Sequence, residues 1–371
     1  MQLLPMQEVI GQIQAGQPLP WGVRDVDGNL LLARGHAVDA AMLKTLLARG
    51  MFVDAAEAAR VNGAVRAATA PRSENFFGRW RMLQSRLNTM LQKPPPDLQR
   101  AIEEVITVLI GMADRDPDKM LFQIMRHDQG RLQLYSITHA LHCAAVCCLT
   151  SRRMAWEEPR RRSLVGAALT MNLSMIELQG RLAGQVAPPT PEQRAEIHSH
   201  PLRSAAMLRV AGFIDEDWLV AVEQHHETAD GKGYPAGVAD MIECAQMLNF
   251  ADVFTAKLCA RASRSAMLSN QVARDIFTEN QGHPMAAALI KELGLYPPGC
   301  FVQLQSGETA IVVRRGDSMN TPHVACLTNR NGDTLTTPLR RDTSKMENSV
   351  IALTPDSNVM VRIPWETLYD D

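Results

Sequence analysis

The sequence predicts a mainly helical domain that lies between two small modules containing β-strands. Between residues 73 and 298, apolar residues recur at the three- and four-residue spacing of amphipathic helices. Before this block, two short apolar runs surround an Asp-Gly pair, which is typical of a β-hairpin. After Pro297-Pro298-Gly299, short β-branched runs alternate with Ser-Gly, Gly-Asp and Asn-Gly turns. We therefore expect three domains, at residues 1–72, 73–298 and 299–371.

The first module is expected to contain a hairpin at residues 17–35, a helix at 39–48 and a linker of small residues at 55–72. Its acidic turn superficially resembles an EF-hand calcium loop. Leu30 stands where that loop needs glycine, and His36 stands where it needs glutamate. The sequence therefore argues against calcium binding at this turn.

Each helix expected in the central block carries an apolar stripe, as the helices of an all-α bundle do. In the first, Phe77, Trp80 and Leu83 share one face, and the Pro94-Pro95-Pro96 run ends the pattern. The expected helices cover residues 77–91, 98–112, 132–151, 164–172, 191–210, 216–224 and 242–262. The expected strands of the last module cover residues 302–304, 309–314, 324–328, 334–337 and 350–353, which predicts a small all-β fold.

Composition excludes several classes of protein. Apolar residues make up 46% of the 371 residues and charged residues 21%, which is ordinary for a soluble globular protein. The net charge of −2 gives no basic field for nucleic acid, and the arginines at 152–153 and 160–162 fit solvated helix faces. The apolar run 140–149 is too short to span a membrane. We expect a cytoplasmic protein without nucleic-acid or membrane partners.

The seven cysteines indicate a reducing compartment. Their number is odd, and they form no CxxC pair. They occur at positions 143, 147, 148, 244, 259, 300 and 326, three of them within one apolar helical run. Reduced thiols in the core of a cytoplasmic protein explain this pattern better than disulfides or zinc.

Residues 225–235 form the most informative segment of the chain. Two adjacent histidines, His225 and His226, offer ligands for a transition metal. A loop with glycines and a proline follows, and these residue types permit a tight, kinked turn. The loop residues are Asp230, Gly231, Lys232, Gly233, Tyr234 and Pro235. This order of residues resembles the signature of HD-GYP domains, bacterial hydrolases of the signalling dinucleotide cyclic di-GMP.

The resemblance covers about residues 125–300 and implies an HD-superfamily helical bundle. Carried over position by position, it implies metal ligands at His139, His200, His225, His226 and Asp252. It also implies phosphate-binding cations at Lys232, Lys257, Arg261 and Arg264, although a solvated helix face explains the last three equally well.

The other half of the family signature is replaced in this chain. In the segment that aligns with the His-Asp dipeptide, Met171 stands for the histidine and Asn172 for the bridging aspartate. Met175 replaces a lysine that assists the substrate, and Tyr135 replaces a glutamate ligand. The only literal His-Asp pair, His127-Asp128, precedes the first motif, and we regard it as unrelated to the site.

These replacements favour a protein that does not hydrolyse its ligand. Asn172 cannot bridge two cations, and a thioether such as that of Met171 is a poor ligand for hard or borderline ions. His139 and Asp252 alone are too few for tight binding, whereas His200 with the histidine pair could hold one ion. We therefore expect no metal, or at most one divalent transition metal (iron, manganese or zinc), at the three histidines.

Three functions remain open at this stage. The first is a catalytically degenerate regulatory or protein-interaction module, whose loop at Gly233-Tyr234-Pro235 contacts a signalling protein such as a diguanylate cyclase. The second is a cyclic di-GMP phosphodiesterase with residual activity from an incomplete, mononuclear site. The third is a sensor that binds cyclic di-GMP without cleaving it. A homodimer through the leucine-rich segment 77–115 is a further expectation, although packing within one chain explains that segment equally well.

Overall fold

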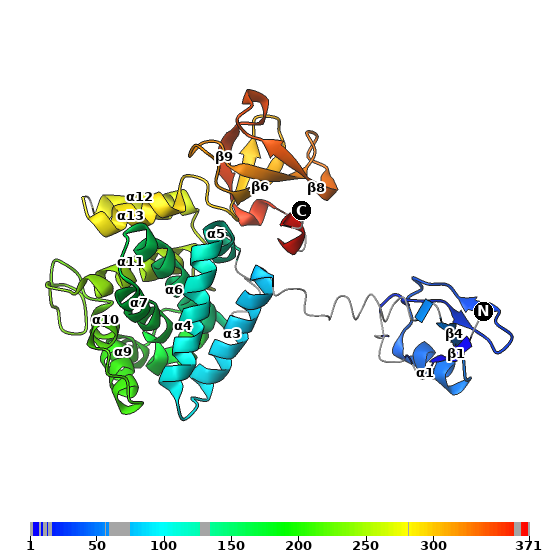
Figure 1. Cartoon of the computed structure of the whole chain (residues 1–371), viewed down its shortest axis with the longest axis horizontal. Coiled ribbons are helices and arrows are strands. Elements are labelled where there is room, and N and C mark those ends of the chain that lie inside the picture. Colours follow the sequence, from blue (N-terminus) through cyan, green and yellow to red (C-terminus); the bar gives the residue numbers. More distant parts are fainter. Residues whose placement is uncertain are drawn as a thin grey trace. The chain divides into compact units, whose positions relative to one another are not determined.

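The structure is a computed structural model that describes residues 3–6, 9, 13, 17–55, 57–58, 75–126, 134–280, 282–359 and 365–369. The chain divides into two compact units, residues 1–75 and 76–371 (Figure 1). The His127-Asp128 pair and most of the linker expected at 55–72 lie outside the described residues.

The described part of the first unit contains a small sheet and helix α1. Its strands are β1 (Leu3–Pro5), β2 (Val23–Arg24), β3 (Leu30–Leu32) and β4 (Phe52–Asp54), in the order β1-β4-β2-β3. The expected hairpin is confirmed, because β2 and β3 pair antiparallel. The Asp25 carboxylate caps the hairpin turn by accepting from the backbone N–H groups of Asp27 and Asn29. The Asp25 carboxylate therefore has a structural role in this turn.

Helix α1 (Ala40–Ala48) begins where the sequence predicts, with Asp39 as its N-cap. The Asp39 carboxylate accepts from the backbone N–H of Met42 at 2.7 Å. The helix closes over a core that includes Trp21 and Val53, both of which are fully buried.

The second unit is a helical bundle followed by a sheet. Its helices are α3 (Phe76–Gln92), α4 (Leu98–Arg115), α5 (Pro117–Met125), α6 (Tyr135–Arg153), α7 (Glu158–Thr170), η3 (Leu173–Met175), α8 (Ile176–Ala183), α9 (Pro191–Val210), α10 (Glu216–Gln224), α11 (Glu243–Leu258), α12 (Ser269–Glu279) and α13 (Pro284–Leu293). The mainly helical fold is confirmed. Helices α5, α8, α12 and α13 were not expected from the apolar pattern.

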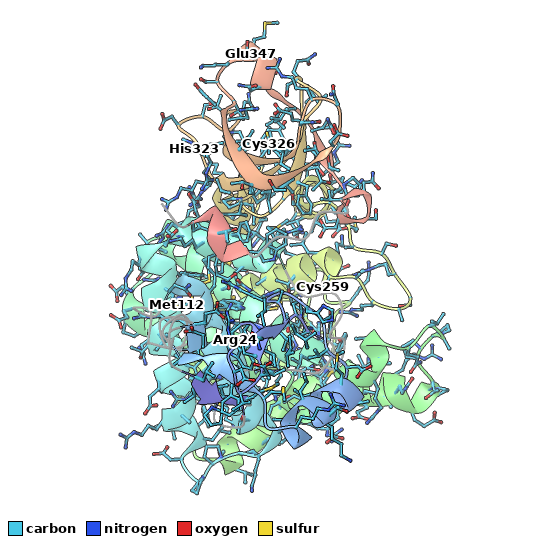
Figure 2. The ribbon with its side chains drawn as sticks, turned by 90° about the vertical axis from the view of Figure 1, so that its right-hand side faces the viewer. Arg24, Met112, Cys259, His323, Cys326 and Glu347 are labelled. Carbon is cyan, nitrogen blue, oxygen red and sulfur yellow. The ribbon has the colours of Figure 1, made fainter. Side chains whose placement is uncertain are left out.

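Helix α6 is the centre of the bundle. Every residue from Ser136 to Ser151 except Thr138 is buried, and α4, α7, α8, α11 and α13 pack around it. A helix that is apolar on all sides must be covered on all sides, which explains its central place. All seven cysteines are free and buried, as the sequence predicts, including Cys259 and Cys326 (Figure 2).

The C-terminal sheet is antiparallel, in the order β8-β7-β6-β5-β9. Its strands are β5 (Phe301–Leu304), β6 (Thr309–Arg314), β7 (His323–Thr328), β8 (Thr334–Asp342) and β9 (Val350–Thr354), which confirms the expected small β-module. One face of the sheet completes the helical core, because Val302, Val312 and Val324 belong to the same buried cluster as the helices. The helices and this sheet therefore share one hydrophobic core.

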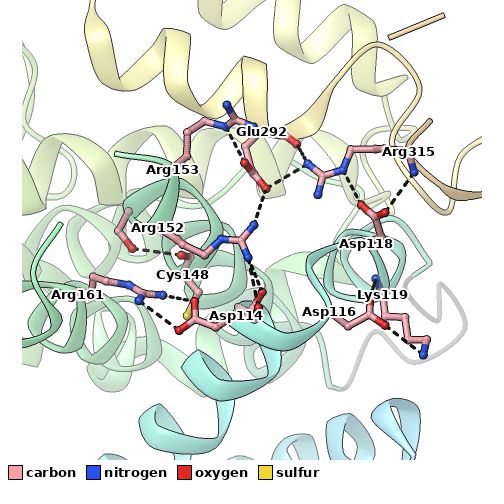
Figure 3. Close-up of polar contacts among 12 residues, drawn as sticks. Asp114, Asp116, Asp118, Lys119, Cys148, Arg152, Arg153, Arg161, Glu292 and Arg315 are labelled. Carbon is pink, nitrogen blue, oxygen red and sulfur yellow. Dashed lines mark hydrogen bonds and ion pairs between the residues drawn. The ribbon is translucent and has the colours of Figure 1, made fainter. Parts of the chain in front are cut away.

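A buried charge network also joins the sheet to the helices (Figure 3). The carboxylate of Glu292 at the end of α13 is 3% exposed and accepts from Arg153 on α6 at 2.6 Å. It also accepts from Arg315, which follows β6, at 3.2 Å. Arg315 in turn donates to Asp118 of α5 at 2.5 Å.

None of the described helices combines the length and the apolar composition that a membrane-spanning segment requires.

Candidate metal centre

Two clusters of metal-ligating side chains lie in the middle of the helical bundle. One contains His200, His225 and His226, and the other contains His139, Cys143 and Asp252. Within each cluster the ligand atoms lie within 4.8 Å of one another. The structure therefore brings together all five residues that the sequence predicts as metal ligands, in two groups of different chemistry.

The three-histidine cluster is built from the middle of α9 and the C-terminal end of α10. His200 lies on α9, which starts with a capping box at Thr190, and His225 is the C-cap of α10. The ring centroid of His200 lies 5.1 Å from that of His225 and 5.1 Å from that of His226. Asn249 of α11 donates to the backbone carbonyl of His225 at 2.8 Å and so fixes the end of α10.

The hydrogen bonds of this cluster leave two lone pairs facing each other. The Nδ1 atom of His200 donates to the carbonyl of Ile197 at 2.5 Å, and Nδ1 of His225 donates to that of Val222 at 2.7 Å. A carbonyl can only accept, so both protons lie on Nδ1 and both neutral rings present an unprotonated Nε2. These two Nε2 atoms are 3.1 Å apart. A cation between them would convert this repulsion into coordination.

The distance between Nε2 of His200 and Nε2 of His225 agrees with the binding of one transition-metal ion by both rings. Two imidazole nitrogens bound to zinc at 2.0–2.1 Å in tetrahedral geometry lie about 3.3 Å apart. Anchoring of the second ring nitrogen by a backbone carbonyl is also what orients metal-binding histidines. His226 completes a set of three, and its side chain remains 22% exposed. The residues present therefore fit a single divalent ion.

Electrostatics keeps these imidazoles in the neutral form that binds metals. Burial, reinforced by the neighbouring imidazole of His226, lowers the pKa of His200 to about 4. Burial and the adjacent rings lower the pKa values of His225 and His226 to about 3. Burial by itself raises the pKa of Asp252, but the hydrogen bond from His139 and the surrounding imidazoles outweigh it and hold that pKa below its usual range.

Asp252 on α11 belongs to the second cluster and also faces the first. One carboxylate oxygen is 2.6 Å from Nε2 of His139, and the other is 4.0 Å from Nδ1 of His226. The His139 ring stacks on Tyr135 at a centroid distance of 5.6 Å. The Tyr135 hydroxyl accepts from Nε of Arg261 at 2.9 Å. Tyr135 thus forms an aromatic cover over His139.

The loop after the histidine pair is held by a carboxylate that sequence reasoning missed. Glu227 is 1% exposed and accepts from the backbone N–H groups of Ala236, Gly237 and Val238 at 2.7–3.1 Å. Nothing in the residue pattern marks a glutamate whose role is to bind backbone amides. The Tyr234 ring stacks on His226 at 4.6 Å, so the loop packs directly on the three-histidine cluster.

The segment from Met171 to Met175 lies beside the helix of His200. Met171 is fully buried in the main core, and Asn172 and Met175 are 8% and 6% exposed. Between them, the Ser174 hydroxyl donates to the carbonyl of His200 at 3.1 Å. An apolar and a neutral side chain therefore occupy the segment where the sequence comparison with HD-GYP domains expects a histidine and an aspartate.

The four predicted phosphate-binding cations have different surroundings. Arg261 lies closest to the clusters, through Tyr135. Lys257 pairs with Asp275 at 2.8 Å, and Arg264 donates to the carbonyl of Ala256. Lys232 is 83% exposed on the loop and pairs with Asp230 at 3.1 Å. The structure does not bring these four side chains into one group.

Comparisons with known proteins agree with this architecture. Residues 108–286 match the family model described as the HD domain, and this range contains both ligand clusters. Over 221 residues the chain is 26% identical to "Cyclic di-GMP phosphodiesterase PA4108" of Pseudomonas aeruginosa, covering 56% of this chain and 53% of that protein. The chain thus spans about half the length of this curated relative.

A solved structure shares the fold. It is Bd1817, described as a HDG"Y"P protein from Bdellovibrio bacteriovorus, with a TM-score of 0.50 and 15% identity. The superposition covers 79% of this chain and 99% of the other. Residues 108–286 therefore have the HD-domain fold, and the chain is similar in sequence to a cyclic di-GMP phosphodiesterase.

Proposed function

We propose that this protein acts in cyclic di-GMP signalling as a regulatory HD-domain protein that does not hydrolyse the dinucleotide efficiently. Its HD domain holds one divalent transition metal at His200, His225 and His226. The surviving metal site positions a phosphodiester or a partner protein and does not drive repeated cleavage. The bound ion supplies a positive charge for the phosphate, and the buried histidines hold that ion in place.

The observation that carries this proposal is the replacement of the ligand pair by Met171 and Asn172. Hydrolysis at a two-metal site uses a pair of ions that stabilise both the attacking and the leaving oxygen. Such a pair needs a bridging carboxylate, and the amide of Asn172 carries no charge. Met171 contributes to the core instead. The segment therefore supports packing better than it supports a second, catalytic ion.

The direct test measures binding and cleavage on the same protein. The full chain is loaded separately with manganese, iron or zinc, and cyclic di-GMP binding is followed by calorimetry while products are followed by chromatography. The Pseudomonas phosphodiesterase serves as the positive control. We expect binding without product, and product formation at a rate comparable with that control would overturn the proposal.

Restoring the replaced residues tests the same point from the other direction. The triple variant Met171→His, Asn172→Asp, Met175→Lys should bind more metal than the wild-type chain and should gain measurable hydrolysis. The double variant without the aspartate, Met171→His with Met175→Lys, is the matched control and should stay inert. A folded triple variant with unchanged metal content would show that this segment does not face the ions.

Residual phosphodiesterase activity is the second candidate, and the completeness of the histidine cluster favours it. One ion with an open coordination position can activate water by itself. Under this alternative, the wild-type chain produces the linear dinucleotide slowly, and His225→Gln abolishes that activity. His198→Gln is the control, since His198 is exposed and stacks on Tyr234 at 4.5 Å without belonging to the cluster.

The proposed partner surface is the loop held by Glu227, with Lys232 exposed at its tip. A signalling protein such as a diguanylate cyclase is the partner that we propose for it. Lys232→Glu reverses the charge at the tip without changing the buried Glu227 contacts, so it should weaken binding to a purified cyclase. Unchanged binding would remove this loop from the interface.

A further inference from the structure

We propose that His139, Cys143 and Asp252 form a second metal site, which contains a thiolate and is selective for zinc. This inference rests on the proposed role of the HD domain as a metal-binding protein. It concerns a different ion from the one at the three histidines. It also assigns a function to Cys143, which the sequence pattern alone places among the core cysteines.

Helix geometry brings the three ligands together. His139 and Cys143 are four residues apart on α6, so their side chains lie on one face. That face packs against α11, where Asp252 contacts His139 and Thr255 contacts Cys143. The Cys143 sulfur lies 3.6 Å from Nε2 of His139, and that nitrogen lies 2.6 Å from a carboxylate oxygen of Asp252.

These distances can be compared with those around a zinc ion. With Zn–S near 2.3 Å and Zn–N near 2.0–2.1 Å in tetrahedral geometry, a sulfur and a nitrogen on one ion lie about 3.6 Å apart. The observed separation between Cys143 and His139 has this value. The His139–Asp252 distance is that of a hydrogen bond and would lengthen by about 0.7 Å to the separation around one ion. Of these two contacts, only the one between His139 and Asp252 therefore has to lengthen when an ion binds.

The thiol of Cys143 adds a ligand beside His139 and Asp252, in the part of the site where Asn172 stands for the bridging aspartate of the family. Without Cys143, His139 and Asp252 offer two ligands, which is too few for tight binding. With it they offer three, and the set combines imidazole, thiolate and carboxylate, all of which are zinc ligands. A soft thiolate favours zinc over magnesium, calcium or manganese. Cysteine thus compensates for the lost aspartate with a ligand of different selectivity.

The surroundings fit a site that joins two helices. Cys143 is fully buried, and its sulfur lies 2.9 Å from the hydroxyl of Thr255, which is on α11 with Asp252. Burial favours the protonated thiol when no ion is near. Binding of zinc forms the Zn–S bond and releases one proton from Cys143 to solvent. An ion held in this way ties α6 to α11, so it stabilises the fold.

Cobalt spectroscopy on the full chain tests the assignment. Co(II) bound to a thiolate gives a near-ultraviolet charge-transfer band that imidazole and carboxylate ligands do not produce. We expect this band in the wild-type chain, its loss in Cys143→Ser, and its retention in Cys147→Ser. Cys147 is the matched control, because it lies one turn further along α6 and is equally buried. A band that persists in folded Cys143→Ser overturns the proposal.

Metal stoichiometry separates this proposal from the preceding one. We expect two ions per wild-type chain and one in both Cys143→Ser and His225→Gln. Cobalt bound without the band would overturn the thiolate site and leave the histidine site intact. No bound cobalt would overturn both. If Cys143→Ser does not fold, X-ray absorption of the zinc-loaded wild-type chain decides, since the assignment requires a sulfur neighbour at about 2.3 Å.

Discussion

Replacing Gly233 with alanine is expected to damage the loop that packs on the histidine cluster. A Cβ at this position would lie 2.5 Å from the carbonyl oxygen of His226 and 2.5 Å from the backbone nitrogen of Thr228, and closer still to Cα of Glu227. Ordinary contacts of such atoms are about 3.5–4.0 Å, so each overlap is about 1 Å. All three neighbours are backbone atoms, which cannot rotate away as a side chain can.

The cost follows from how firmly those neighbours are held. The backbone N–H of Tyr234 donates to His226 at 3.1 Å, and the carboxylate of Glu227 binds three further amides of the loop. Relief therefore requires a shift of the whole loop, for which we expect a loss of about 3 kcal/mol in the free energy of unfolding. In a unit of this size the unfolding midpoint would fall by about 6 °C.

Thermal unfolding followed by circular dichroism measures this effect, and metal analysis of the same samples follows the site. Gly111→Ala is the matched control. No atom lies within 4 Å of the Cβ it would add, and it lies inside α4, so it should gain about 0.5–1 kcal/mol. An unchanged midpoint in Gly233→Ala would refute the argument that this glycine is required by close backbone contact.

Two further predictions concern the charges that hold the C-terminal sheet. Glu292→Gln should lower the free energy of unfolding in urea by about 2 kcal/mol, because it leaves partly exposed arginines around a buried neutral group. Glu177→Gln, at a 92% exposed site, should change almost nothing, and equal losses in both variants would contradict this reasoning. Hydrogen bonding to Arg341 lowers the pKa of Glu308. The Glu308 carboxylate therefore contributes its full stabilisation above pH 4.5, and this contribution is lost as pH falls through the lowered pKa. The stability difference between wild type and Glu308→Gln should therefore shrink in acid, and a constant difference from pH 7 to pH 3 would be inconsistent with this linkage.

Much of the fold could be predicted from periodicity. Helices α9 and α10 begin and end at the predicted residues, because Pro191 and Asp215 mark their starts in the sequence. Helix α5 was missed, since its nine residues are too few to establish an apolar period before the next segment. The sequence also did not predict that the helices and the C-terminal sheet share one core, because apolar residues in a strand do not reveal which surface covers them.

The site could be predicted where the ligands are close in sequence or match a known motif. His225 and His226 are adjacent, and the sequence grouped His139 with Asp252, which the structure places 2.6 Å apart. Helical spacing places Cys143, and not Cys147, one turn from His139, although both cysteines belong to the apolar core. The packing of α6 against α11 was not predictable, and it brings Asp252 to His139 and Thr255 to Cys143.

The common core of helices and sheet has a consequence for how this unit can respond to a ligand. Val302, Val312 and Val324 cover the helical core directly, so the sheet cannot move away as a rigid body without exposing apolar surface to water. The part of the chain from residue 76 onward should consequently unfold as one cooperative block. If a molecule that binds the sheet changes the affinity of the histidine cluster for an ion, binding of the ion must change the affinity of that molecule by the same factor.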